Sequence, residues 1–94
     1  MDEESSDGVQ VWLVERTYSD DEQNLVILTY ATPDGKRYFR KERALTSFTD
    51  SRDTTAAVEA DPENLGSVDD GDLRAQYAAE AQRMQEVHDT DDAI

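Results

Sequence analysis

The residues with the clearest potential for binding chemistry lie between Lys36 and Arg43, in the segment KRYFRKER. Five of the nine basic residues of the chain fall in this segment, interleaved with two aromatic rings. Basic side chains can follow a phosphate backbone while aromatic rings stack on bases, so this composition is typical of a surface for single-stranded nucleic acid. The candidate nucleic-acid-binding residues are Lys36, Arg37, Tyr38, Arg40, Lys41 and Arg43.

Salt weighs against that interpretation. With about four phosphate contacts, a tenfold rise in salt would lower the affinity roughly 10³-fold. The same cations can balance the acids of a neighbouring strand, cover apolar surface with their stems, or protect an exposed strand from edge pairing. An acidic protein partner is a further alternative. We therefore expect charge balance and edge protection from segment 36–43, and we keep nucleic-acid binding as the alternative function.

Residue types that support catalysis or metal binding are sparse. His88 is the only histidine and there is no cysteine, so disulfides and thiolate metal sites are excluded and a catalytic triad would have to use His88. The aspartates at 69, 70 and 72 lack the alternating spacing and later Glu of a calcium loop, and helix capping accounts for them. The four glycines lie apart and form no phosphate-binding loop. We expect no enzyme activity, no cofactor and no specific metal site.

Three extended segments would carry the candidate residues. Val9 to Tyr18 and Leu25 to Thr32 are rich in β-branched and aromatic residues and are predicted to be strands. The sequence Thr-Pro-Asp-Gly at 32–35 predicts a turn, because Pro presets its first central position and Gly tolerates a positive φ. Residues 36–43 would then return as the third strand of an antiparallel sheet.

The turn also predicts which residues of the second and third strands lie opposite each other. We expect a three-residue loop with a bulge, closed by Thr32 and Lys36. A slip of one residue would exchange the two faces of the strand, so the assignment is testable. The expected pairs are Tyr30 with Tyr38, Leu28 with Arg40, Val26 with Glu42, Thr29 with Phe39, and Ile27 with Lys41.

The C-terminal half is expected to hold one helix. Residues 54–60 are interpreted as a short edge strand, with a helical turn as the alternative, and 61–66 as a turn or one helical turn. A helix capped by Asp70 or Asp72 would run to about Val87. The fold class is therefore α+β, a three- to four-stranded antiparallel β-meander with one C-terminal amphipathic helix. The apolar stripe of that helix comprises Leu73, Tyr77, Ala81 and Met84.

The net charge of the chain indicates the salt concentration of its environment. Twenty-three acidic residues stand against nine basic ones, for a formal net charge of −14. Such self-repulsion fades in molar salt, where the Debye length falls to about 3 Å. We expect one domain over 9–88, flanked by acidic tails at 1–8 and 89–94. Neither a signal-peptide core nor a run of ~20 apolar residues is present, which predicts a cytoplasmic protein with no membrane segment.

The chain resembles the small uncharacterised acidic proteins common in halophilic archaea. The resemblance extends over the whole length and is carried by the segment LVILTYATPDGKRYFRK, residues 25–41, and by the Asp-rich linkers. It implies adaptation to molar salt. It implies no functional residues.

Both faces of the predicted sheet carry apolar side chains, unlike a sheet with one face in water. One helix covers one face, so the other would expose an apolar patch unless residues 44–68 fold back over it. We therefore expect a small interaction or structural module that buries one sheet face in a homodimer or a larger complex. The expected partner-binding residues are Trp12, Val14, Tyr18, Ile27, Tyr30 and Phe39.

Overall fold

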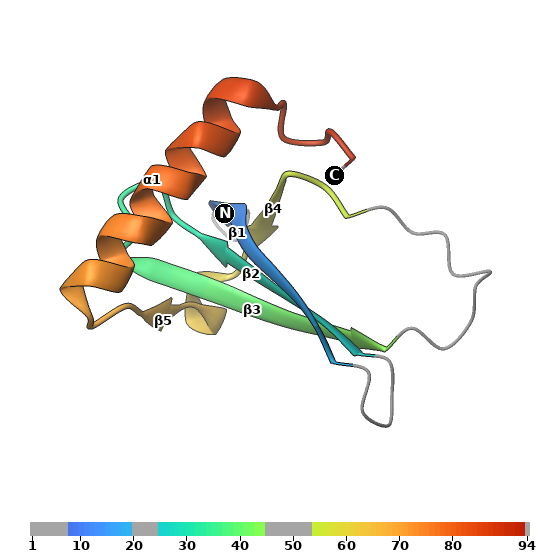
Figure 1. The fold of residues 1–94 in the computed structure, drawn as a ribbon, viewed down its shortest axis with the longest axis horizontal. Coiled ribbons are helices and arrows are strands. Elements are labelled where there is room, and N and C mark those ends of the chain that lie inside the picture. The colour runs from blue at the N-terminus through green and yellow to red at the C-terminus, as the bar shows by residue number, and fades with distance from the viewer. Residues whose placement is uncertain (1–7, 20–24, 45–53, 94) are drawn as a thin grey trace, which may run out of the picture.

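The computed structural model describes residues 8–19, 25–44 and 54–93. Helix α1 (Gly71–Val87) packs on an antiparallel sheet whose strand order is β4-β1-β2-β3-β5 (Figure 1). The strands are β1 (Val9–Ser19), β2 (Leu25–Ala31), β3 (Arg37–Ala44), β4 (Ala57–Ala60) and β5 (Gly66–Ser67). The predicted α+β class and the β1-β2-β3 meander are confirmed, as is the edge strand within 54–60. The two-residue β5 adds a strand that was not predicted.

The register between β2 and β3 differs by one residue from the predicted one. Tyr30 pairs with Phe39, and Ala31 pairs with Tyr38, where Tyr30 was expected opposite Tyr38. Residues of β3 that were predicted to share a face with Tyr30 therefore lie on the other face. The predicted register was wrong because the loop between the two strands is one residue longer than expected.

Hydrogen bonds inside the turn explain the longer loop. The Asp34 carboxylate accepts from the Lys36 N–H at 2.9 Å and from the Thr32 hydroxyl at 2.6 Å. This holds Lys36 within the turn, and the ladder begins instead where the Thr32 N–H donates to the Arg37 carbonyl at 3.1 Å. Gly35 has a φ of 73°, as the turn prediction required.

A β-bulge interrupts β1 and also changes its faces. Leu13 pairs with Tyr30 and Glu15 pairs with Thr29, so Val14 is the extra residue between them. Beyond the bulge Tyr18 pairs with Val26 and shares a face with Leu13, whereas simple alternation predicted it to share a face with Trp12. A bulge inserts one unpaired residue and so reverses the alternation of every residue after it.

Helix α1 covers the sheet face that carries Trp12, Ala31 and Tyr38, here called the helix face. The Asp70 side chain caps the helix, accepting from the Asp72 N–H at 2.8 Å, which confirms one of the two predicted caps. Three of the four residues of the predicted stripe are buried, whereas Leu73 stays 36% exposed. In the described part of the chain, no helix has the length and apolar character needed to cross a membrane. The buried stripe residues are Tyr77, Ala81 and Met84.

The opposite face, which carries Leu13, Leu28 and Tyr30, is also buried within the chain. Because β4 and β5 lie at opposite edges of the sheet, the connector between them crosses it. Leu65 of this connector packs against the main core cluster, which contains Leu13, Leu28 and Tyr30. Part of segment 44–68 therefore folds back, as the alternative to partner burial required. Residues 45–53 of that segment and residues 1–7 of the predicted N-terminal tail lie outside the described residues.

The predicted C-terminal tail lies beside the start of β4. The N–H groups of Ala56 and Ala57 donate to the carbonyls of Asp92 at 2.9 Å and Thr90 at 3.0 Å. His88 closes this arrangement, with its Nδ1 3.4 Å from a carboxylate oxygen of Asp92. Residues 90–93 thus contribute backbone hydrogen bonds to the edge of the domain.

Candidate functional site

The helix face continues beyond α1, and this continuation is the main candidate surface. The register places Glu15, Thr29 and Arg40 in one row across β1, β2 and β3, and Thr17, Ile27 and Glu42 in the next. Figure 1 shows the three strands extending past the helix at this end. Ile27 is half-buried, Thr29 is buried, and the other members are exposed. The outer sheet face is defined here as Glu15, Thr17, Ile27, Thr29, Arg40 and Glu42.

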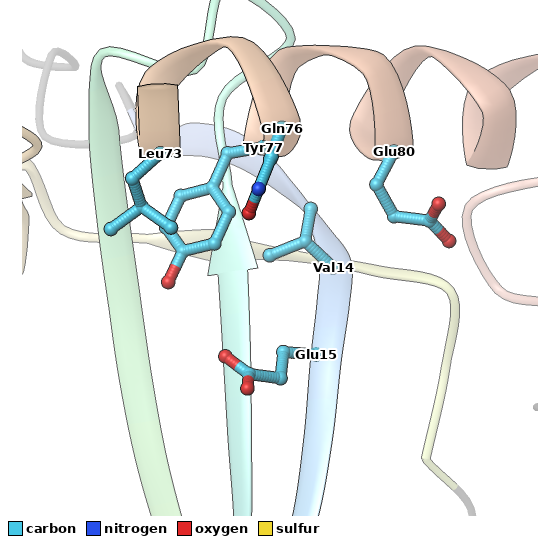
Figure 2. Close-up of a pocket in the computed structure, with 6 residues that line it drawn as sticks. All are labelled: Val14, Glu15, Leu73, Gln76, Tyr77 and Glu80. Atoms are coloured by element: carbon cyan, nitrogen blue, oxygen red, sulfur yellow. The ribbon is translucent and has the colours of Figure 1, made fainter. Parts of the chain in front are cut away.

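A pocket of about 340 Å³ lies where α1 meets the outer sheet face. Figure 2 shows Leu73 and Tyr77 reaching from α1 toward the strands, and Glu15 extending from β1 below them. The bulge places Val14 in the same wall. The lining residues are Val14, Glu15, Leu73, Gln76, Tyr77 and Glu80.

Two guanidinium groups act on the ionisable side chains that line this pocket. Burial raises the pKa of the Tyr77 phenol, and the Glu15 carboxylate raises it further, while Arg40 acts in the opposite direction by charge and by hydrogen bonding. The Arg83 guanidinium hydrogen-bonds to both carboxylate oxygens of Glu80 and lowers the pKa of that group. Glu80 is therefore paired within α1, and Tyr77 lies within reach of both Glu15 and Arg40.

The polar groups that line the pocket are of few kinds. Its lining contains two carboxylates, a phenol and an amide, with neither a histidine nor a cysteine beside them. Within residues 8–19, 25–44 and 54–93, no group of three or more acids and histidines is placed to hold a metal ion. A second pocket, of about 260 Å³, lies at the outer edge of β4 beside Thr90 and Asp91.

The predicted partner-binding residues do not share one surface. Trp12 and Tyr30 are 4% and 2% exposed and belong to the core, on opposite faces of the sheet. Phe39 is half-buried, with its ring centroid 6.1 Å from that of Tyr30. Tyr18 is 65% exposed and faces away from α1. Val14 lines the pocket, and Ile27 lies on the outer sheet face.

The candidate nucleic-acid-binding residues are likewise divided. Tyr38 and Arg40 lie on the helix face, where the Arg40 guanidinium carbon is 5.4 Å from the centre of the Tyr38 ring. Lys41 pairs with Leu28 and belongs to the opposite face, and Arg43 pairs with Val26. Lys36 lies in the turn and Arg37 begins β3.

Sequence reasoning missed Glu15, Thr17 and Glu42 as members of a candidate surface. They carry no motif, and two register details bring them together: the bulge in β1 and the longer loop before β3. Nothing in the sequence distinguishes Glu15 and Glu42 from the other acidic residues of the chain.

Comparison with known proteins places the chain in a family. No curated protein and no solved structure matches the chain. The model of a family of unknown function, DUF7967, matches residues 5–94. Because this match covers nearly the whole sequence, the chain belongs to the family of unknown function DUF7967.

Proposed function

We propose that this protein is a small interaction module that binds a protein partner through the outer sheet face. The observation that supports the proposal is that helix α1 covers only one half of one sheet face. Helix α1 buries Trp12 and Ala31 on that face, and the strands then continue past the helix with Ile27 half-buried at the centre of the continuation. An apolar centre with a polar rim is the usual layout of a protein–protein interface.

The position of Ile27 on the sheet gives further support. Ile27 lies between Thr17 and Glu42, whose side chains are exposed. The part of the Ile27 side chain that is still exposed can therefore be covered only by a group from outside this row. Covering a side chain of this type completely contributes about 1.5–3 kcal/mol relative to full exposure, and a half-buried one correspondingly less. The partner is expected to add polar contacts around a modest apolar centre.

A nucleic-acid function has weaker support. Its basic residues are split between two faces, and Phe39 packs on Tyr30 rather than standing free for stacking. Arg40 and Tyr38 do share one face and contact each other. Anisotropy with short single-stranded DNA and RNA at ~2 M salt tests this alternative, and micromolar binding abolished by Tyr38→Ala in a folded protein would favour it over the protein partner.

The test of the interaction module is the size of the tagged protein in extract of its own cells. We expect it to elute well above the mass of one chain, and Ile27→Asp to shift it to the single-chain mass. Lys41→Asp, on the opposite face of the neighbouring strand, is the matched control and should leave the elution unchanged. A wild-type protein that elutes as a single chain in extract, and when purified, would contradict the proposal.

We also infer that the module acts in a cytoplasm of molar salt. The support is the net charge of −14, whose repulsion is screened only at high ionic strength. Dialysis from ~3 M to ~0.1 M salt should lower both the circular-dichroism signal and the thermal midpoint. An unchanged signal and midpoint would contradict salt adaptation. Fluorescence imaging of a tagged chain tests whether the protein lies in the cytoplasm.

A further inference from the structure

We propose that the partner is an extended segment of another protein, with a central Asp or Glu, that adds a strand to the edge of β3. This inference rests on the proposed function and names how the partner binds. β5 pairs with β3 only at Arg37 and Tyr38, and β3 continues past it (Figure 1). Among the described residues no strand lies beside this continuation. An unpaired edge of this kind is a template for one more strand.

The backbone groups that an added strand would meet belong to Arg40 and Glu42. The Arg37 carbonyl accepts from the N–H of Thr32, so it points toward β2, whereas the Lys36 carbonyl accepts from the residue that follows β5 and points outward. Backbone groups alternate between the two sides of a strand in an antiparallel sheet, so those of Arg40 and Glu42 also point outward. The open edge of β3 is defined here as the N–H and carbonyl groups of these two residues.

The connector before β5 turns away from the open edge. By the register of β5, Asn64 would be the residue opposite Arg40. Its N–H donates instead to the Asp61 carbonyl at 2.8 Å, inside the 3₁₀ turn Pro62–Asn64. This turn ends the pairing of β5 with β3 before it reaches Arg40.

The other edge of the sheet has a backbone partner from the chain itself. The C-terminal segment lies along the start of β4, where the Ala57 N–H donates to the Thr90 carbonyl at 3.0 Å and Thr55 forms a bridge with Ala93. The Thr55 hydroxyl donates to the Ala57 carbonyl at 2.8 Å. The two edges therefore differ, and the open edge of β3 is the one that can accept a strand from outside.

Charge favours an acidic residue at the centre of the added strand. This residue would lie opposite Lys41, which is exposed and has no ion pair in the part of the chain that the structure describes. The row of Lys41 across the sheet holds Leu28 and Arg16 and no acid. Opposite charges on neighbouring strands attract and like charges repel, so a carboxylate fits here and a cation does not. Arg40 contributes only its backbone, because its guanidinium lies against the Tyr38 ring.

Binding through backbone groups is compatible with molar salt. The N–H and carbonyl groups are uncharged, so a Debye length of about 3 Å leaves their hydrogen bonds in place. Contacts to phosphate lose affinity under the same conditions. Lys41 therefore selects among strands, while the open edge supplies most of the affinity.

A second copy of this chain fits the open edge poorly. Two β3 strands paired about a two-fold axis at Glu42 would oppose that carboxylate to its own copy. With the axis at Lys41 or at Arg40, Ala44 of each copy would take a place that β5 of the other copy already occupies. The added strand therefore comes from a different protein.

Proline at position 42 tests the open edge directly. The Glu42 N–H points away from β2, so Glu42→Pro removes a donor to the added strand and keeps the ladder between β2 and β3. Glu42→Thr removes the same carboxylate and keeps the N–H, so the difference between the two variants isolates the backbone donor. In serially diluted extract of the protein's own cells, Glu42→Pro should weaken the complex at least about tenfold more than Glu42→Thr. Circular dichroism checks that both variants are folded.

A zero-length cross-link tests the added strand in the unmodified protein. The chain has two lysines, Lys36 and Lys41, and a carbodiimide joins a lysine amine to a carboxylate in contact with it. In the complex we expect Lys41 to couple to an Asp or Glu of the other protein, located by mass spectrometry. Lys36 is the internal control, because its backbone lies beside the end of β5 and not on the open edge. Lys41→Arg should remove the coupled product.

The outcomes separate this inference from the proposed function. A complex that Ile27→Asp and Glu42→Pro both disrupt, with Lys41 coupled to a carboxylate of the other protein, supports the added strand. A complex that Ile27→Asp disrupts and a folded Glu42→Pro does not overturns the added strand and leaves the interaction module standing. Absence of coupling at Lys41, coupling to a second copy of this chain, or loss of the complex on nuclease treatment also overturns it. A single chain in extract contradicts both proposals.

Discussion

The two halves of the helix face are built from the same three strands and differ in almost every other respect. Under α1 the face carries Trp12 and Ala31, both buried, with Met84 packed into the same core cluster as Trp12. Beyond α1 it carries Glu15, Arg40 and other charged or polar residues, with Ile27 at the centre. The β1 bulge at Val14 lies at the border between the two halves.

The difference teaches how one face of a short sheet can be covered at one end and exposed at the other. The turn between β2 and β3 is locked against the helix, where Gln82 donates to the Pro33 carbonyl at 2.9 Å and the Gly35 Cα faces the backbone of Arg74. The bulge then reverses the alternation of β1, which turns Glu15 and Thr17 to the helix face and Tyr18 away from it. Burial is concentrated under the helix, and Glu15, Thr17, Arg40 and Glu42 in the half beyond it stay exposed.

The largest expected effect comes from Gly35→Val, at the end of the sheet that the helix covers. A Cβ at this position would lie 2.9 Å from the Ala78 nitrogen and still closer to the Arg74 carbonyl, and the φ of +73° strains any β-branched residue. We expect a loss of about 3–5 kcal/mol in the free energy of unfolding, enough to unfold a small domain.

Gly71→Ala is the control for that change. A Cβ there meets nothing within 4 Å, and the residue is helical, so the substitution should be neutral or stabilising by up to about 1 kcal/mol. Thermal unfolding in ~3 M salt measures both variants. Equal effects of Gly35→Val and Gly71→Ala would show that the helix does not pack on the turn.

Met84→Ala should have the next largest effect. Met84 is 4% exposed and lies in the main core cluster with Trp12. Truncating a buried methionine removes apolar contacts and leaves a cavity, so we expect a loss of about 2–3 kcal/mol in chemical unfolding. Val87→Ala is the matched control, since Val87 lies on the same helix and is 59% exposed. A loss below about 1 kcal/mol for Met84→Ala would contradict the packing of this half.

Asp34→Ala is expected to cost about 1 kcal/mol at neutral pH, because it removes the carboxylate that accepts from Thr32 and Lys36. These hydrogen bonds hold the pKa of Asp34 below the ordinary value of an aspartate. A lowered folded-state pKa means that the contribution is fully present above the unfolded pKa and is lost as pH falls through the folded value. The gap between wild type and Asp34→Ala should therefore close at the pH where Asp34 of the folded chain becomes protonated, which lies below the usual range of an aspartate. A gap that stays constant down to that pH would show that the carboxylate charge plays no part.

Ile27→Ala should give the smallest effect on a dilute, monomeric sample. Ile27 is half-buried on the outer sheet face, so part of its surface is already in water in the folded chain. We expect a loss below about 1 kcal/mol, well under the loss for Met84→Ala. A loss as large as that of Met84→Ala in dilute solution would remove the distinction between the two halves.

The sequence alone determined the elements and the class of the fold. β-branched and aromatic residues predicted β1 and β2, the turn residues predicted the positive φ of Gly35 and the return of the chain as β3, and Asp70 with the spacing of Tyr77, Ala81 and Met84 predicted α1. These are local properties, because a strand pattern, a turn and a helix cap each depend on neighbours in the sequence. The family of unknown function adds no residue to this list.

Only the tertiary structure decided which of those residues share a surface. One additional loop residue before Arg37 and one unpaired residue at Val14 changed the faces of β3 and β1. Neither leaves a periodic signal in the sequence, because the loop length depends on the hydrogen bonds of Asp34 inside the turn and the bulge on how β1 pairs with β2. For that reason the predicted partner-binding set was divided between the core and two faces, and the row of Glu15 and Arg40 could be assembled only from the paired strands.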